Sequence, residues 1–165
     1  SSRLKPDDMV VVIFHDHGSR YVGKIYNDQW MMERGFFHVK TVKDIVLARQ
    51  GRPLVTLKPS QRVVEALATM KKFGIEHIPI MLEGEPVGAI SESSLFGKLI
   101  DDTTLRDSYI RDIMHAPFPV VSEDTPIERL SAYINKDNGA VLTRNESNRY
   151  HIVTKYDILQ SLAGA

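Results

Sequence analysis

Two stretches of this chain follow the same plan, and this internal repeat limits the possible folds more than any other feature. Residues 88–95 (GAISESSL) form an apolar run that ends in a hydroxyl at Ser91, and an apolar helical pattern follows. Residues 152–159 (IVTKYDIL) repeat this order, with Thr154 63 positions after Ser91 and Asp157 63 positions after Ser94. A repeat of this size predicts two similar units, each with a strand that leads into a helix. Such a corner presents polar side chains and the positive end of a helix to a small ligand.

Each copy reads as one strand, one helix, a hairpin of two strands and a closing helix, judged from apolar periodicity and turn residues. In the first copy these elements are expected at residues 54–57, 60–73, 78–82, 87–90 and 94–100. In the second copy they are expected at residues 120–121, 125–138, 140–143, 151–154 and 156–162. A short helical start opens each copy, at residues 41–46 and 110–114. In the closing helix of the first copy we expect Leu95, Phe96 and Leu99 to face inward.

The first forty residues lie outside the repeat. Residues 9–14 are an apolar run typical of a strand buried on both faces, and residues 29–34 predict a short helical turn that Gly35 stops. Such a strand needs partners that this segment does not supply, which suggests a piece of a larger domain. His15 and His17 are spaced to share a metal ion, but no third ligand accompanies them, and we expect no metal site.

The composition argues against several classes of function. Lys plus Arg and Asp plus Glu each total 21, so there is no overall field to attract nucleic acid or an anionic membrane. The chain has no cysteine, which excludes disulfides, thiolate metal sites and cysteine nucleophiles and fits a cytoplasmic protein. Its longest apolar run is too short to cross a bilayer, and the N-terminus lacks the plan of a signal peptide.

The β-α-β-β-α order, present twice, resembles a tandem pair of CBS domains, also called a Bateman module. The sharpest family motif is a Thr or Ser at the strand end followed three residues later by Asp, which Thr154 and Asp157 satisfy; Ser91 and Ser94 satisfy it in part. The resemblance implies an α/β (α+β) fold in which two β-α-β-β-α repeats pack about a pseudo-twofold axis, preceded by a strand–helix segment. It divides the chain into a leading segment at residues 1–40, repeat 1 at residues 41–104 and repeat 2 at residues 105–165.

Residues 10–31 resemble the C-terminal end of the catalytic domain of cystathionine β-synthases and related pyridoxal-phosphate enzymes. The resemblance rests on a strand, an aspartate, a glycine-containing turn, an Arg-Tyr helix start and an Asn-Asp-x-Trp-Met corner at residues 27–31. His17 stands where that family usually has a serine, so no cofactor role is assigned to it. A catalytic-domain end followed by a CBS pair is the order of cystathionine β-synthase. We therefore expect pyridoxal phosphate only in a catalytic domain outside this chain, and no cofactor or catalytic residue within it.

One carboxylate can accept hydrogen bonds from both hydroxyls of a ribose, and such charge-assisted bonds are stronger than neutral ones. Asp157 in the first helical turn is in place to do this, and Thr154 can hold a ligand with its hydroxyl. In the CBS family these two residues act with the helix-to-strand loop of the other repeat, which here is residues 74–79. The resemblance thus implies an adenosyl site whose other members are Ile152, Tyr156, Ile75, Glu76, His77 and Ile78. The alternative is that Thr154 and Asp157 only cap the helix.

The corresponding site on repeat 1 carries Ser94 where repeat 2 has a carboxylate. A serine can donate to one ribose oxygen but cannot accept from both hydroxyls in the same way. We therefore expect this second site to be weak or empty; its members are Ser91, Ser94, Asn138, Gly139 and Ala140.

The predicted function is regulatory and non-catalytic. An adenosyl ligand, which is S-adenosylmethionine, AMP or ATP, is expected to bind between the repeats and to bias the catalytic domain of a cystathionine β-synthase-like parent. The family also implies a homodimer formed through the CBS helices. The alternative is a structural or dimerisation module without a ligand. We expect no nucleic-acid or membrane partner.

Overall fold

A computed structural model describes residues 7, 9, 11–12, 23–24, 27–35, 39–49, 53–135 and 138–163. The chain divides into two compact units, residues 1–39 and residues 40–165, which are described separately below. No helix among the described residues is long and apolar enough to cross a membrane.

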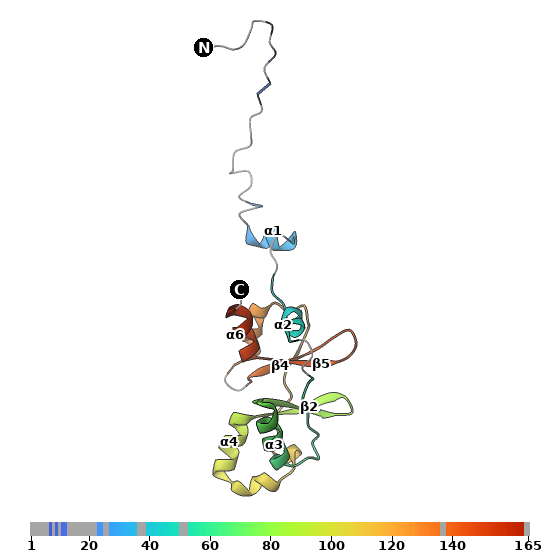
Figure 1. Ribbon diagram of the computed structural model, residues 1–165, viewed down its shortest axis with the longest axis vertical. Helices are drawn as coiled ribbons and strands as arrows, with labels where there is room; N and C mark the ends of the chain where they lie inside the picture. The colour runs from blue at the N-terminus through green and yellow to red at the C-terminus, as the bar shows by residue number, and fades with distance from the viewer. Residues whose placement is uncertain are drawn as a thin grey trace. The chain divides into compact units, whose positions relative to one another are not determined.

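The N-terminal unit contains one described helix, α1 (Asp28–Glu33), drawn in light blue in Figure 1. The Asn27 side chain caps it, because its Oδ1 accepts a hydrogen bond from the Trp30 amide at 3.0 Å. Gly35 follows the helix with a φ of 72°, so the predicted turn that ends at a glycine is confirmed.

The predicted strand at residues 9–14 is not formed where the structure describes it. Met9, Val11 and Val12 are exposed and have no regular secondary structure. A strand is stable only when neighbouring strands satisfy its backbone, and the described part of this unit offers none. The other residues of that stretch, and His15 and His17, lie outside the described residues.

Repeat 1 is built around the antiparallel hairpin of β1 (His77–Leu82) and β2 (Glu85–Ser91). The two turn residues, Glu83 and Gly84, have φ values of 51° and 88°, which suits the tight turn that matches strand twist. Two helices complete the repeat, α3 (Val63–Phe73) and α4 (Glu92–Asp101), and a 3₁₀ helix, Thr103–Asp107, follows. The hairpin and both helices therefore confirm the predicted order.

Two details of repeat 1 differ from the prediction. The expected strand at residues 54–57 is reduced to a single parallel bridge between Leu57 and Ile80. Phe96 is 67% exposed instead of facing inward, whereas Leu95 is fully buried and Leu99 packs against the core. Adjacent residues on a helix point about 100° apart, so Phe96 faces outward once Leu95 faces the core.

Repeat 2 contains a three-stranded sheet in the order β3 (Val120–Val121), β4 (Ala140–Arg144) and β5 (Tyr150–Thr154). β3 runs parallel to β4, and β4 and β5 form an antiparallel hairpin. The chain then enters α6 (Lys155–Ala163). These elements lie within one or two residues of their predicted bounds.

The predicted helix of residues 125–138 is a shorter 3₁₀ helix, η3 (Ile127–Ala132). Beyond it, local side-chain bonds replace helical ones: Asn138 donates from Nδ2 to the Tyr133 carbonyl at 2.7 Å, and its amide donates to Asn135 Oδ1 at 3.0 Å. Asparagine side chains compete with helical hydrogen bonds in this way. The buried stripe is kept, since Ile127 and Leu130 are buried and Ile134 packs beside them.

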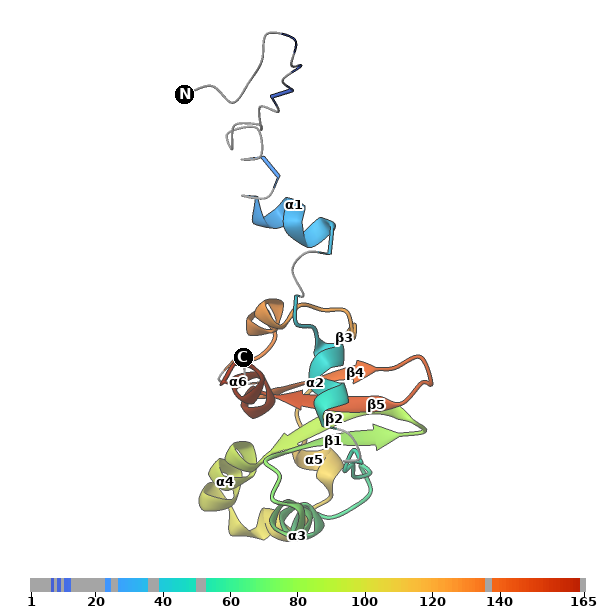
Figure 2. The ribbon, with the colours of Figure 1, turned by 45° about the horizontal axis from the view of Figure 1, so that its top comes forward.

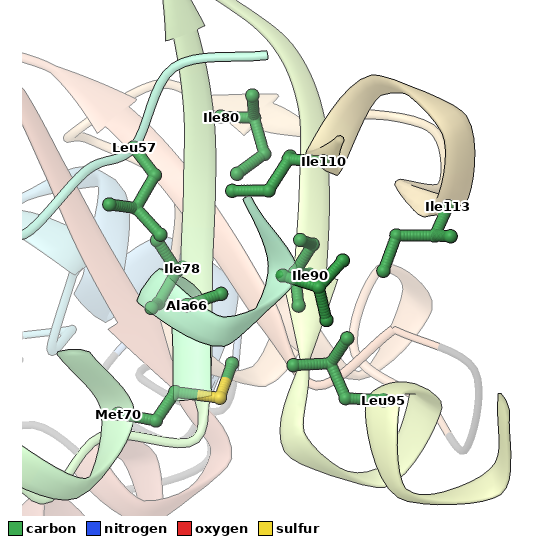
Figure 3. Close-up of a cluster of buried hydrophobic side chains, with 10 residues drawn as sticks. Leu57, Ala66, Met70, Ile78, Ile80, Ile90, Leu95, Ile110 and Ile113 are labelled. Atoms are coloured by element: carbon green, nitrogen blue, oxygen red, sulfur yellow. The ribbon is translucent and has the colours of Figure 1, made fainter. Parts of the chain in front are cut away.

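The short helices that open the two repeats are exchanged between them. α2 (Val42–Ala48) precedes repeat 1, but its buried Val42 and Ile45 join the core of repeat 2. α5 (Ile110–Ile113) precedes repeat 2, but its Ile110 and Ile113 join the core of repeat 1, as Figure 3 shows. Each core is therefore completed by a helix from the other half of the sequence.

The two hairpins lie face to face, with β4–β5 against β1–β2 (Figures 1 and 2). Between them is a small apolar cluster of Ala89, Phe118, Ala140 and Leu142. At its edge the Tyr150 hydroxyl donates to Glu85 Oε2 at 2.7 Å, and Arg144 Nη2 lies 3.2 Å from Glu85 Oε1. The packing of the two hairpins joins the two repeats into one module.

Candidate ligand site

The corner between β5 and α6 has the geometry of a reciprocal cap. The Thr154 amide and its Oγ1 both donate to Asp157 Oδ2, each at 2.7 Å, and the Asp157 amide reaches Thr154 Oγ1 at 3.5 Å. These bonds satisfy free amides at the start of α6 and fix the carboxylate beside its positive end. The capping interpretation of this pair is therefore correct as a description of its structure, and it leaves a ligand role untested.

Arg49 is bonded to the same carboxylate. Its Nη1 lies 3.0 Å from Asp157 Oδ2 and donates to the Ile152 carbonyl at 2.7 Å. The side chain of Asp157 is only 7% exposed and that of Arg49 is 29% exposed, so this ion pair is largely withdrawn from water. Sequence reasoning missed Arg49 because the partners are 108 positions apart and meet only through the exchange of α2.

A cavity of about 420 Å³ opens beside this ion pair. Its walls come from α2, from the segment that follows it, and from the β4–β5 hairpin with its turn. The apolar part of the lining consists of Val46, Leu47, Pro53, Leu54 and Ile152.

Charged groups of both signs stand around the same cavity. Lys43 and Arg49 bring positive charge, and Glu123 and Glu146 bring negative charge. An apolar wall with a few polar groups is the usual build of a small-molecule site. Of the predicted site residues only Ile152 is in the lining, with Asp157 behind Arg49.

The predicted loop of the other repeat lies elsewhere. Glu76 and His77 line a second cavity of about 410 Å³ together with Ser91. Ile75 packs against the core of repeat 1, and Ile78 is fully buried inside it. Neither isoleucine lines either of these two cavities.

Tyr156 is 70% exposed on α6 and is also absent from the lining of both cavities. The predicted set is thus divided. Ile152 lies at the first cavity, and Glu76 and His77 lie at the second.

The residues predicted for the weaker site meet at the junction of the repeats. Ser91 caps α4 by accepting a bond from the Ser94 amide at 3.3 Å, as Thr154 does in repeat 2. Asn138 is held by Tyr133 and Asn135, and Ala140 is buried between the hairpins. The carbonyl of Gly139 accepts a bond from the Lys155 amide at 3.2 Å.

His77 sits against Gly139 and links the two predicted sites. A methyl group at position 139 would lie 2.8 Å from His77 Cε1 and would overlap its Nε2. The His77 ring also meets the Phe118 ring edge-on at 5.9 Å between centroids, with His115 on the same phenyl ring at 6.0 Å. Burial lowers the pKa of His77, Glu76 partly offsets this, and His115 adds to the lowering.

Within the part of the chain that the structure describes, no group of three or more His, Asp and Glu side chains could hold a metal ion.

Two hairpin-and-helix repeats that exchange their opening helices and pack through their hairpins define a tandem-repeat module. The family model of the CBS domain matches residues 42–101 and 110–164, and the chain belongs to that family. The predicted family and fold are confirmed.

Two known relatives extend beyond the repeats. The chain is 25% identical to the cystathionine beta-synthase of Saccharomyces cerevisiae, over 97% of this chain and 40% of that protein. It is 22% identical to the cystathionine beta-synthase of Dictyostelium discoideum, over 98% of this chain and 36% of that protein. The chain thus spans about two fifths of the length of these relatives and is homologous to their C-terminal regions.

Solved CBS pairs share the fold. The CBS domain pair of protein MJ0100, in complex with 5′-methylthioadenosine and S-adenosyl-L-methionine, is 26% identical with a TM-score of 0.61, over 77% of this chain and 98% of that one. CBSX2 in complex with AMP is 21% identical with a TM-score of 0.58, over 75% of this chain and 96% of that one.

Proposed function

We propose that this chain is the adenosyl-ligand-binding regulatory module of a cystathionine β-synthase-like enzyme and is not itself catalytic. The observation that carries the proposal is the fixed Asp157 carboxylate at the start of α6, next to a cavity of about 420 Å³ with an apolar wall. The adenosyl compounds bound by MJ0100 and the AMP bound by CBSX2 support the choice of ligand class. The likeness to cystathionine beta-synthases over nearly the whole chain supports the choice of parent.

The chemistry of the site follows from two features of a nucleoside. Its ribose has neighbouring hydroxyls, which one carboxylate accepts together, and Asp157 is that acceptor, with Thr154 holding it in place. Its base is flat and apolar on both faces, and Ile152 with Pro53 and Leu54 supplies a matching wall.

The second cavity is the weaker candidate for the same class of ligand. It has the cap of Ser91 and Ser94 in place of a carboxylate, with Glu76 and His77 beside it. Ile75 and Ile78 support the Glu76–His77 segment from the core of repeat 1. At the cap position a neutral hydroxyl forms weaker hydrogen bonds than a carboxylate, which favours repeat 2 as the stronger site.

Isothermal titration of the chain with S-adenosylmethionine, AMP and ATP tests the proposal. We expect saturable binding of at least one ligand near one site per chain, and a loss of at least about tenfold in affinity for Asp157→Asn, since a hydrogen bond to a charged group contributes roughly 1.5–3 kcal/mol. Asp112→Asn is the matched control, because Asp112 is exposed on α5 and belongs to neither lining. Absence of binding by all three ligands would refute the adenosyl-sensor function.

A role in assembly is the second candidate, and exposed apolar side chains favour it. Phe96 and Ile100 on α4, and Leu159 and Leu162 on α6, are all more than half exposed. Exposed apolar side chains one turn apart on a helix can form an interaction surface, and the resemblance to the CBS family implies a dimer formed through its helices. Sedimentation of the wild-type chain and of the Phe96→Glu variant decides this: a dimer that the variant splits supports assembly, and a wild-type monomer at high concentration refutes it.

A further inference from the structure

We propose that Arg49 competes with the adenosyl ligand for the Asp157 carboxylate, so that occupation of the site releases the C-terminal end of α2. This inference rests on the proposed function, and it adds a mechanism by which ligand binding changes the structure around the site. Three observations carry it: the bonds on Asp157, the position of Arg49 at the cavity, and the way α2 is attached to repeat 2.

The bonds on Asp157 make Arg49 a direct competitor. Among the described residues, every hydrogen bond to this carboxylate ends on Oδ2, which accepts from the Thr154 amide, the Thr154 hydroxyl and Arg49 Nη1. An oxygen with three donors has no capacity left for a ribose hydroxyl. A ribose that donates one hydroxyl to each oxygen of the Asp157 carboxylate must therefore displace one of the donors on Oδ2.

Arg49 is the donor that can leave. The Thr154 bonds span three residues of one helical turn and hold the cap, so losing them would disrupt the start of α6. Arg49 reaches Asp157 from another part of the sequence through a flexible, partly exposed side chain, and it already lines the cavity. Its guanidinium can turn into the cavity, which it already lines, and be hydrated there.

The attachment of α2 gives this displacement a consequence. At its N-terminal end the Val42 amide donates to the Thr125 carbonyl at 3.0 Å, Lys40 Nζ donates to the Ser161 carbonyl at 2.8 Å, and Val42 is fully buried. Toward its C-terminal end Leu47 is exposed, and Arg49 is the C-cap. The Arg49 bonds to Asp157 and to the Ile152 carbonyl therefore fasten the last turn of α2 to repeat 2.

In the sequence, α2 is the first element after residues 1–39, the part that lies outside the CBS match. A ligand that displaces Arg49 thus loosens the C-terminal end of α2, from which the chain passes from the core of repeat 2 to that of repeat 1. The ligand and Arg49 exclude each other at one oxygen, so their coupling is reciprocal. Removal of Arg49 must raise the affinity for the ligand by the same factor by which Arg49 lowers it in the wild type.

The test measures binding of adenosine and of AMP to the wild-type chain and to Arg49→Met, which keeps the length of the side chain and removes the guanidinium. We expect both ligands to bind about tenfold more tightly to the variant, within the usual range of such couplings. Arg49→Lys keeps the charge, and its affinity for both ligands is expected to lie between those of the wild type and Arg49→Met. Arg129→Met is the control, because Arg129 is exposed on η3, outside the lining of both cavities, and should leave both affinities unchanged.

The outcomes separate this inference from the proposed function. If the wild type and Arg49→Met bind equally, Arg49 has no role in binding. If the variant loses affinity for AMP alone, Arg49 binds the phosphate. Either result refutes the competition and leaves the sensor function standing. Binding only by the variant would refute the sensor function of the wild-type chain, and with it the release of α2 by a ligand. Binding by no protein, Arg49→Met included, would refute both.

Hydrogen exchange supplies a readout that does not need a ligand. Amides of residues 46–49 should exchange faster in Arg49→Met than in the wild type, while those at the start of α2 stay protected. Saturation of the wild type with ligand should produce the same pattern. Slower exchange at residues 46–49 on ligand binding would contradict the release of α2.

Discussion

Gly139 and His77 provide a direct test of how closely the two repeats pack. In Gly139→Ala the new methyl carbon would lie 2.8 Å from His77 Cε1 and would overlap Nε2, whereas carbon atoms in contact stay about 3.5–4.0 Å apart. The ring meets Phe118 edge-on, so its movement would disturb the cluster between the hairpins. The substitution therefore forces the repeats apart or moves the ring from its preferred position.

The magnitude follows from two opposing terms. Overpacking of this kind costs typically about 1–3 kcal/mol. Replacing glycine by alanine also restricts the unfolded chain and returns about 0.4–1 kcal/mol. The net loss should be about 1–2 kcal/mol, which lowers the melting temperature by about 2–8 °C for a chain of this size.

Urea unfolding followed by circular dichroism measures this loss, and Gly97→Ala is the matched control. Gly97 lies within α4 with no atom close to the position of a Cβ, so alanine there should stabilise the chain by about 0.5–1 kcal/mol. In a His77→Ala background, Gly139→Ala should lose its cost, because the ring it meets is gone. Equal effects of Gly139→Ala and Gly97→Ala would show that the repeats are not locked at this contact.

Three further predictions use the same urea assay. Because burial lowers the pKa of His77, the unfolded chain binds its proton more readily; stability should fall as the pH drops from about 6.5 toward the lower folded value, and His77→Gln should reduce this dependence. Ser91→Ala should cost about 1 kcal/mol, because it removes the cap that accepts from the Ser94 amide. Leu130→Ala should cost about 2–5 kcal/mol through loss of a fully buried side chain in repeat 2.

The hairpins and closing helices could be predicted because their signals are local. The structure is determined within a few residues by alternating β-branched residues, by the Glu83–Gly84 turn and by the glycine after α3. The 63-residue offset then supports the elements assigned in one copy by those assigned in the other. The Thr154–Asp157 pair could be found for the same reason, since a cap is a three-residue relation.

The rest depends on relations that a single sequence does not display. The apolar residues of α2 predict that it is buried, but nothing in them says against which repeat, so Arg49 was not recognised as a partner of Asp157. The 3₁₀ form of η3 depends on Asn135 and Asn138 side chains that bond to nearby backbone instead of leaving it to a helix. The resemblance to the CBS family places Ile75 and Ile78 at a ligand; in the structure Ile78 lies in the core of repeat 1 and Ile75 packs against it.

The exchange of α2 and α5 also gives the two similarly built corners different surroundings. Both corners are capped in the same way, but only repeat 2 places a carboxylate at the cap, and only its corner meets a guanidinium from the exchanged helix. Repeat 1 has Ser94 at that place and receives α5, which contributes Ile110 and Ile113 to the core. Under the proposed displacement of Arg49, repeat 2 is the responsive half, and repeat 1, which receives an apolar helix, is the fixed half. Introducing a carboxylate at position 94 alone would therefore create a second acceptor for ribose hydroxyls. It would not create a second guanidinium that competes with the ligand.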